Sequence, residues 1–361
     1  MKRMVLWSTV VLALAMVMPT SASAGILVGE KGDMDLHLGA VLQAGFAFQM
    51  QDSVMTTTGL EPVVNDFWLR RVRMLLSGTI VPDRVEYLVQ TEFNGAPAIL
   101  DYKARFFYIP QTEICFGRFL PNYSLYMPVS TAKLELINYP VTTAKTAMWR
   151  ETGIQTHTMT EYVDFSLGLF NGADVMSPNT RDNNDAKDYL VRADLKPPVG
   201  DAHLRVGGYF YANNYHGAGA DIKEDDTFTD THLGFFAKAD YPLDEMMLKL
   251  RGELVMSTEE SGDVDDPDET EMAGFFAQAG LRLNEQWEGI LRYESWDPNT
   301  ENDNDTIAGS EEDAHSAITV GINHYIDGTN AMIYLNFVQK MFQHEDVDSE
   351  SSILGQVQIA L

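Results

Sequence analysis

The chain has 361 residues, of which 53 are acidic and 25 basic, so its formal net charge is −28. An apolar content of 45% is that of a folded protein and excludes wholesale disorder. The acid excess argues against nucleic acid as a partner, because phosphate binding needs clustered Lys and Arg. Cys115 is the only cysteine, which excludes an internal disulfide and any paired-cysteine metal or redox site.

Residues 1–24 have the pattern of a secretory signal peptide. Two basic residues precede an apolar run over residues 4–18, and Ala22-Ser23-Ala24 offers small side chains for cleavage. The apolar run is shorter than the ~20 residues that a membrane-spanning helix needs, which argues against an anchor. We therefore expect cleavage on export, with residues 25–361 as the folded chain.

Apolar and polar residues alternate through most of the remaining chain. From Leu36 to Phe48 every second residue is apolar or small, and residues 163–169 repeat the pattern. Such alternation is typical of a β-strand with one apolar and one polar face. The pattern predicts sixteen strands, at residues 33–50, 66–80, 83–95, 98–109, 112–119, 147–158, 161–171, 187–196, 201–212, 230–241, 246–257, 271–283, 287–296, 313–326, 329–342 and 351–361.

The connections between these segments alternate between short and long, with one exception at residues 95–98. Asp327-Gly328 is typical of a two-residue hairpin. A membrane barrel with short turns on one rim and long loops on the other has this asymmetry. We predict an all-β, transmembrane antiparallel β-barrel of sixteen strands with short periplasmic turns and long acidic extracellular loops; a soluble exported β-protein such as a lectin is the alternative. The long connections cover residues 51–65, 120–146, 172–186, 213–229, 258–270, 297–312 and 343–350.

In such a barrel the polar strand faces point into the lumen, and several of these faces carry bases. Two interpretations remain open: a wall that attracts anions, or cross-strand ion pairs that keep the lumen wet and rigid. Arginine suits phosphate because its planar fork can donate to two oxygens. The lumen-facing candidates for ligand contact are Arg71, Arg73, Lys103, Arg105, Arg205 and Arg251.

The acid excess gathers in the long connections. One interpretation is Ca²⁺ or Mg²⁺ binding that bridges the loops to anionic lipopolysaccharide. The other is a solvated rim that keeps the loops extended, and the sequence contains no EF-hand pattern. The candidate cation-site residues are Asp263, Asp265, Asp266, Asp303 and Asp305.

Aromatic residues recur near the strand ends and predict girdles at the two membrane interfaces. Examples are Trp149, Phe170, Tyr241, Trp287 and Tyr293. Cys115 lies between two apolar residues and is expected to serve packing.

Four short motifs give a more specific indication. Residues 67–78 read Phe-Trp-Leu-Arg-Arg-Val-Arg-Met-Leu-Leu-Ser-Gly, and residues 117–124 read Gly-Arg-Phe-Leu-Pro-Asn-Tyr-Ser. Residues 150–153 read Arg-Glu-Thr-Gly, and residues 169–172 read Leu-Phe-Asn-Gly. In this order and spacing they resemble the phosphate-selective porin O and P family of Gram-negative bacteria, over roughly residues 66–172.

The resemblance implies a homotrimeric, sixteen-stranded diffusion channel in the outer membrane, with a third extracellular loop that folds into the lumen and constricts it. The connection 120–146 follows the fifth strand, where that loop is expected. Arg71 and Arg73 match the family's arginine-rich second strand, and Arg118 stands at a polar position of its Gly-x-Phe motif. The further site candidates in this loop are Tyr123, Tyr126, Tyr139, Lys133 and Lys145.

We therefore predict a passive porin for small hydrophilic solutes, including inorganic anions such as phosphate, surrounded by outer-membrane lipid and lipopolysaccharide. No cofactor is expected, apart from the loop cations considered above. No enzyme is expected either, because the eight histidines show no HExxH spacing and no GxSxG motif is present. The alternative function is a structural or adhesive barrel whose acidic loops bind divalent cations or envelope polymers.

Overall fold

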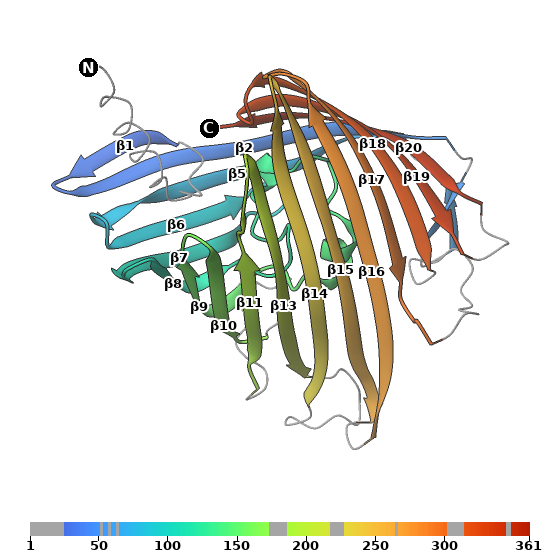
Figure 1. Ribbon diagram of the computed structural model, residues 1–361, viewed down its shortest axis with the longest axis horizontal. Coiled ribbons are helices and arrows are strands. Elements are labelled where there is room, and N and C mark those ends of the chain that lie inside the picture. Colours follow the sequence, from blue (N-terminus) through green and yellow to red (C-terminus); the bar gives the residue numbers. More distant parts are fainter. Residues whose placement is uncertain are drawn as a thin grey trace, which may run out of the picture.

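The computed structural model describes residues 25–50, 53–56, 59–62, 65–172, 186–216, 227–263, 266–301, 314–343 and 348–361. Nearly all of them belong to β-strands, and most strands join one continuous antiparallel sheet (Figure 1). Within these ranges, no helix is long and apolar enough to span a bilayer. The signal peptide predicted over residues 1–24 lies outside the described residues, so its removal stays a prediction.

The strands follow the chain in the order drawn in Figure 1. The first half supplies β1 (Ile26–Lys31), β2 (Met34–Gln49), β5 (Asp66–Val81), β6 (Val85–Glu92), β7 (Ala98–Ile109), β8 (Thr112–Phe119), β9 (Glu151–Met159), β10 (Val163–Phe170) and β11 (Asp188–Leu195). The second half supplies β12 (Pro198–Val199), β13 (Ala202–His216), β14 (Thr227–Leu243), β15 (Met246–Asp263), β16 (Asp266–Arg282), β17 (Trp287–Asp297), β18 (His315–Asp327), β19 (Ala331–Phe342) and β20 (Glu350–Ala360). A separate hairpin consists of β3 (Ser53–Thr56) and β4 (Gly59–Pro62).

The sheet closes on itself because β2 pairs with β20. The pairing runs from Val41↔Ala360 to Gln49↔Ser352, so no strand edge is left along this seam. β11 and β12 both pair with β13 and form one interrupted barrel strand, whereas β1 pairs with β2 alone. The barrel therefore has sixteen strands, which confirms the predicted fold class and strand number.

Several segments differ from the sequence-based expectation: the hairpin of β3 and β4 falls within the predicted connection 51–65, and β14 begins within the predicted connection 213–229. Residues 26–31 lie outside the predicted strands but form β1, which pairs with the start of β2. Residues 258–270 do not form a long loop, because β15 continues to Asp263 and β16 begins at Asp266. The backbone ladder continues along this acidic stretch, where cross-strand hydrogen bonds outweigh the repulsion between facing acids such as Glu260 and Glu269.

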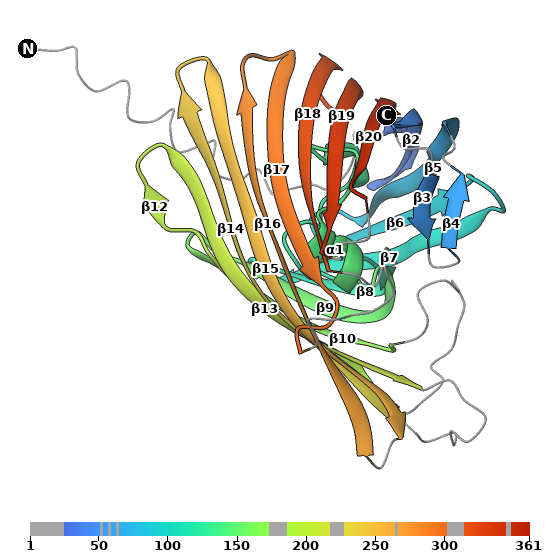
Figure 2. The same cartoon turned by 90° about the vertical axis from the view of Figure 1, so that its right-hand side faces the viewer.

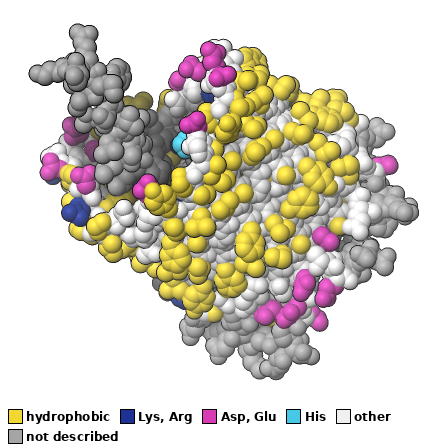
Figure 3. All heavy atoms as spheres, viewed as in Figure 1, with side chains coloured by type: hydrophobic (Ala, Val, Ile, Leu, Met, Phe, Trp, Pro, Cys, Tyr) yellow, Lys and Arg dark blue, Asp and Glu magenta, His cyan; other side chains and the backbone are white. Residues whose placement is uncertain are grey.

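The two faces of the sheet have the polarity expected of a barrel in lipid. On β14, the outward Leu233 and Phe235 are 40% and 52% exposed, while the inward His232 and Phe236 are 5% and 4% exposed. Figure 3 shows hydrophobic side chains across the strands and acidic side chains gathered toward the ends. Apolar side chains on the outer surface suit contact with acyl chains, and the charged ends suit water.

Some aromatic rings lie across a glycine of the neighbouring strand. Tyr209 on β13 faces Gly234 on β14 inside the barrel, and a Cβ on Gly234 would lie 2.0 Å from the Tyr209 ring. On the outer face, a Cβ on Gly355 would lie 2.0 Å from the ring of Phe46. These glycines are needed because a side chain at either position would displace the ring.

The connection 120–146 folds into the barrel, where Figure 2 shows its helix α1 beside the wall strands. It contains a short 3-10 turn, η2 (Thr131–Lys133), and the helix α1 (Val141–Thr146). Tyr123, Met127 and Ile137 are at most 1% exposed although they lie in a connection between strands. The loop and the strands around it thus form a packed core inside the barrel.

Candidate functional site

The first part of the loop 120–146 lies against strands β9–β15. Arg192 on β11 donates to the carbonyl oxygen of Ser124, and its Nη1 also lies 3.1 Å from Oδ1 of Asn122. Glu253 on β15 accepts a hydrogen bond from the backbone nitrogen of Leu125 at 2.5 Å. Wall side chains therefore supply partners for loop backbone groups that have no strand ladder of their own.

The later part of the loop follows β17–β20 in the same way. Gln358 Nε2 on β20 donates to the carbonyl oxygen of Ala132 at 2.8 Å. Asn336 Oδ1 on β19 accepts from the backbone nitrogen of Ile137 at 2.9 Å. The helix α1 then packs against β15, β16 and β17. The loop is thus attached to the wall along most of its length.

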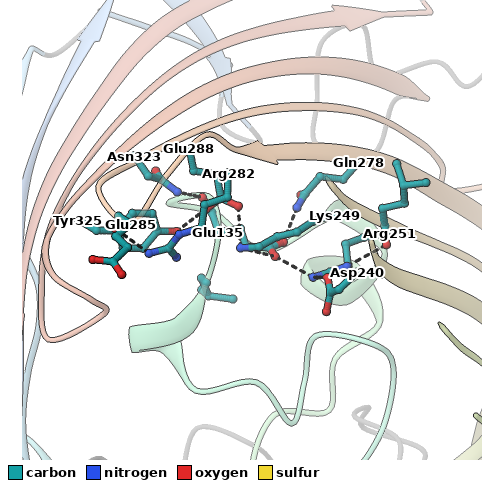
Figure 4. A network of polar contacts seen from close by, with 12 residues as sticks. Glu135, Asp240, Lys249, Arg251, Gln278, Arg282, Glu285, Glu288, Asn323 and Tyr325 are labelled. Atoms are coloured by element: carbon teal, nitrogen blue, oxygen red, sulfur yellow. Dashed lines mark hydrogen bonds and ion pairs between the residues drawn. The ribbon is translucent and has the colours of Figure 1, made fainter. Parts of the chain in front are cut away.

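Glu135 joins a network of charged side chains on this side of the lumen (Figure 4). Its Oε1 lies 3.1 Å from Nη2 of Arg251 and 3.7 Å from Nζ of Lys249. Arg251 also pairs with Asp240, and Lys249 with Glu288, each at 2.6 Å. The network ties the middle of the loop to β15, where the charges neutralise one another.

Strands β5–β7, in contrast, remain accessible from the lumen. No residue of β5 or β6 is fully buried, and Asp101 is the one fully buried residue of β7. On β11, the inward Asp188, Leu190, Arg192 and Asp194 are all at most 4% exposed. We call the inward face of β5–β7 the bare wall and that of β8–β20 with β2 the covered wall. The solvent-accessible lumen along the bare wall is called the passage.

A β-bulge brings two consecutive arginines of β5 into the passage. Gln43 on β2 pairs with Arg71 and the next residue pairs with Leu69, so Arg70 is the extra residue. Arg70 Nη2 donates to Oδ1 of Asn138 in the loop at 2.9 Å, and Arg71 Nη1 donates to Oε1 of Gln43 at 2.7 Å. Both guanidinium groups therefore face inward, although strict alternation predicts only Arg71 there.

Several other bases around the passage have carboxylate partners. Arg70, Arg71 and Lys103, however, form no ion pair within the described ranges. Lys103 Nζ instead lies 5.8 Å over the centre of the Phe119 ring. The ion pairs are Arg73–Glu92 (2.8 Å), Arg105–Glu86 (2.7 Å), Arg105–Glu113 (2.7 Å) and Arg150–Asp101 (3.0 Å).

Tyr139 of the loop lies within the electrostatic reach of these arginines. Burial raises the pKa of its phenol, and the positive charges of Arg71, Arg73, Arg150 and Arg70 oppose that rise. The phenol therefore stays neutral at physiological pH and can donate a hydrogen bond to an anion. Its ring also packs edge-on against Trp149 at 5.5 Å between centroids.

Four predicted site residues lie on the bare wall, and others lie elsewhere. Arg71, Arg73, Lys103 and Arg105 are the four on β5 and β7. Lys133 is exposed on the loop and Lys145 is exposed on α1. The remaining predicted bases are Arg251 in the Glu135 network, Arg205 in ion pairs with Asp164 and Asp194, and Arg118, which is only 5% exposed.

Two of the three predicted loop tyrosines are packing residues. Tyr123 is 1% exposed and lies between the rings of Tyr209 and Tyr211, at 4.7 and 5.4 Å between centroids. Tyr126 is 6% exposed and donates to Oε2 of Glu135 at 2.8 Å. Tyr139 is almost as buried, at 7% exposed, and belongs to the same core cluster, but it differs in lying beside the arginines of the passage.

Sequence reasoning did not single out Arg70 or Arg150. Arg150 begins the Arg-Glu-Thr-Gly motif, which is a signal that could have identified it. Arg70 stands in the quoted motif at residues 67–78, but its inward direction has no sequence signal, because a bulge depends on how the neighbouring strand pairs.

The predicted cation sites fall mostly outside the described residues. Asp265, Asp303 and Asp305 lie in undescribed segments, and for Asp263 and Asp266 only the backbone is described. In the part of the chain that the structure describes, no cluster of three or more His, Cys, Asp or Glu side chains could hold a metal ion. Cation binding at the rim therefore stays a prediction.

Comparison with solved structures shows which known proteins share this fold. No protein-family model and no curated protein sequence matches the chain. The outer membrane channel DcaP of Acinetobacter baumannii superimposes with a TM-score of 0.65 at 10% identity, over 92% of this chain and 99% of that chain. An anion-selective porin from Comamonas acidovorans superimposes with a TM-score of 0.60 at 11% identity, over 91% of this chain and 100% of that chain. The outer-membrane protein OmpT of Vibrio cholerae superimposes with a TM-score of 0.58 at 11% identity, over 93% of this chain and 100% of that chain.

The fold is that of an outer-membrane porin. At 10–11% identity the similarity concerns the fold and carries no site residue from those structures to this chain. The arginines of the bare wall are therefore assigned from the geometry of this porin fold alone.

Proposed function

We propose that this chain is a passive diffusion channel of the Gram-negative outer membrane whose passage favours small anions over cations of similar size. The porin fold and the apolar outer surface support the channel and its location. The observation that carries the anion preference is the bare wall, where Arg70, Arg71 and Lys103 have no carboxylate partner in the described chain.

The charge of the passage wall is positive although the whole chain is strongly acidic. Six bases there outnumber four acids, and the acids are paired with Arg73, Arg105 and Arg150. A narrow lumen with low-dielectric walls focuses the field of unpaired charges, which raises the local concentration of counter-ions. Acidic loops at the mouth act on the same ions only weakly, since salt screens them beyond about 8–10 Å.

Among small anions, we propose phosphate as the one that the passage prefers. The resemblance of residues 66–172 to phosphate-selective porins supports it. The adjacent guanidinium groups of Arg70 and Arg71 support it as well, because each can donate to two oxygens.

We also propose that three copies assemble. The resemblance supports a trimer, and a trimer form of the Vibrio cholerae OmpT is among the solved structures with this fold. On the outer face, Thr156 and Thr158 of β9 lie opposite Leu167 and Phe165 of β10. The less apolar surface of β9 suits contact with another subunit better than contact with lipid.

The test is single-channel conductance of the refolded barrel in a planar bilayer, with a KCl gradient for the reversal potential and added phosphate afterwards. We expect an anion-preferring potential and a block by phosphate. The double variant Arg70→Gln/Arg71→Gln should lower the Cl⁻/K⁺ permeability ratio about fivefold, because two unpaired charges leave the passage. Lys31→Gln is the matched control, since Lys31 is exposed on β1 outside the barrel wall.

Each outcome separates the proposals. A cation-preferring potential that ignores the double variant contradicts the anion preference. Conductance that phosphate does not block contradicts phosphate as the preferred anion, while the proposal of a diffusion channel stands. A correctly folded barrel without any conductance contradicts the channel, and supports a structural barrel whose lumen the loop 120–146 closes.

A further inference from the structure

The loop 120–146 contributes acid to the lumen at a single position. Glu135 is its only acidic residue, beside the two bases Lys133 and Lys145. The side of the lumen toward which Glu135 points therefore decides whether the arginines of the bare wall face a negative charge across the passage.

Glu135 is bound on the covered wall by both of its carboxylate oxygens (Figure 4). Oε2 accepts from Nε2 of Gln278 at 2.6 Å and from the hydroxyl of Tyr126 at 2.8 Å. Oε1 lies 3.1 Å from Nη2 of Arg251. The backbone carbonyl of the same residue accepts from Nδ2 of Asn323 at 2.7 Å. Turning this carboxylate toward the passage would break its contacts with Gln278, Tyr126 and Arg251, while the backbone contact with Asn323 would hold the residue in place.

The part of the loop that touches β5 is neutral or basic. Asn138 Oδ1 accepts from Arg70, and Thr131 Oγ1 accepts from Nη1 of Arg73 at 3.2 Å. Lys133 lies between these two positions and is exposed. The loop groups that contact the arginines of β5 are thus a hydroxyl and an amide, and the one charged residue between them in sequence is a base.

The acids of the bare wall and Glu113 of the adjacent β8 are also engaged. Glu92, Glu113 and Asp101 have side chains that are only 15%, 15% and 6% exposed, and each is paired with an arginine. Glu86 is 36% exposed and pairs with Arg105 at 2.7 Å. An ammonium group on a solute would have to displace an arginine to reach any of them.

We propose that the passage selects solutes whose charged groups are all negative, and that it rejects zwitterions as well as cations. The proposal rests on the proposed anion-preferring channel and adds a class of excluded solute. A zwitterion gains at its carboxylate beside Arg70 and Arg71, but its ammonium group is repelled and loses water without a partner. Selectivity then depends on Glu135 pointing away from the arginines.

The test measures liposome swelling with the refolded barrel and three solutes of similar size: potassium lactate, β-alanine and the neutral propylene glycol. Valinomycin is present in all liposomes, so that K⁺ crosses the bilayer with lactate and charge balances without passing through the barrel. The wild type should pass lactate at least about fivefold faster than β-alanine. Asn138→Asp places an acid beside Arg70, where the amide oxygen already accepts a hydrogen bond. Lys133→Glu exchanges an exposed base for an acid in the loop segment between the two residues that contact β5. Both should lower the lactate/β-alanine ratio about threefold or more.

Asn284→Asp is the matched control for Asn138→Asp. Asn284 lies in the turn between β16 and β17, where its Oδ1 accepts from two backbone nitrogens that an aspartate would also satisfy. The control should leave the ratio unchanged. Gel mobility before and after heating confirms that each variant folds, and Lys133→Glu keeps the test valid if Asn138→Asp does not fold.

The outcomes distinguish this inference from the proposed function. Equal wild-type rates for lactate and β-alanine, or ratios that neither variant changes, overturn the inference while the channel stands. Swelling no faster than in empty liposomes for all three solutes contradicts the channel itself. A high wild-type ratio that both passage variants lower and the control leaves unchanged supports the inference.

Discussion

The bare wall and the covered wall arise from the same alternation of polar and apolar residues, but their charged side chains are used differently. Arg192 on the covered wall is 4% exposed, with Asp194 and the carbonyl oxygen of Ser124 as partners. Arg71 on the bare wall has no carboxylate partner among the described residues; it is partly buried and donates to Gln43 of β2. The contrast shows that the same residue type, on strands with the same alternation, anchors loop backbone at Arg192 but contacts only a neighbouring strand side chain at Arg71.

The largest effect is expected on the covered wall, at the centre of its aromatic packing. Tyr123→Ala should lower the free energy of unfolding by about 4 kcal/mol, because it empties a site enclosed by Tyr209 and Tyr211. Urea denaturation of the detergent-folded barrel measures the change. Tyr123→Phe is the control and should cost about 1 kcal/mol, for the hydrogen bond to Thr146. Equal losses for the two variants would show that packing is not the main contribution.

Removing one arginine from each wall compares them directly. Arg192→Met should cost about 3 kcal/mol of unfolding free energy, since Asp194 loses a buried bidentate partner and Ser124 loses its donor. Arg105→Met should cost only about 1 kcal/mol, because water in the passage can solvate Glu86 and Glu113. The same urea titration measures both. A larger loss for Arg105→Met would contradict the distinction between the walls.

A smaller effect is expected where a ring covers a glycine. Gly234→Ala should destabilise the barrel by about 2 kcal/mol, because the new Cβ would lie 2.0 Å from the Tyr209 ring. Gly289→Ala on β17 has no atom within 4 Å of its new Cβ and should change stability by less than about 0.5 kcal/mol. The temperature at which gel mobility changes on heating ranks the two variants. Similar temperatures would mean that the Tyr209 ring moves aside without cost.

The smallest effect on stability is expected from Glu135→Gln. The amide keeps the size of the carboxylate and can accept from Gln278, but it loses the charge that attracts Arg251 and Lys249. We expect a loss of about 1 kcal/mol or less, with increased current noise in single-channel records as the loop fluctuates. Noise equal to that of the wild type would show that the backbone contacts of the loop suffice to fix it.

Strand positions were the part of the fold that the sequence predicted best, because one face of every barrel strand meets lipid. The period of two is therefore imposed on residues such as Leu233 and Phe235 regardless of what the inner face does. The sequence did not predict β1, because its apolar residues do not alternate with polar ones. Ile26, Leu27 and Val28 are consecutive and all exposed.

The interior could be predicted less well, because it depends on where the loop folds. Cys115 is 3% exposed and serves packing, as its apolar neighbours indicate. The assignment of Phe170 to an interfacial girdle is wrong, since its ring is 1% exposed and packs inside the barrel against Phe119. Trp149 likewise packs on Tyr139. Near a strand end, a ring of the inner face and a ring of the membrane interface have the same sequence context.

The same limit applies to the charged residues. The bases of the lumen divide into two groups: Arg205 and Arg251 are ion-paired, whereas Arg71 and Lys103 form no ion pair with any described residue. Sequence alone could not separate them, since the partners come from strands whose register and loop contacts only the structure shows.

The bulge at Arg70 suggests how the charge of such a lumen can change over evolutionary time. Deleting the extra residue at this point of β5 removes one guanidinium group from the lumen, and inserting one adds a side chain there, while the pairs on either side, Arg71 with Gln43 and Leu69 with Ala44, stay intact. A single codon gained or lost could therefore retune permeability without any substitution in the rest of the barrel, which makes short insertions in wall strands as informative as point mutations when related channels are compared.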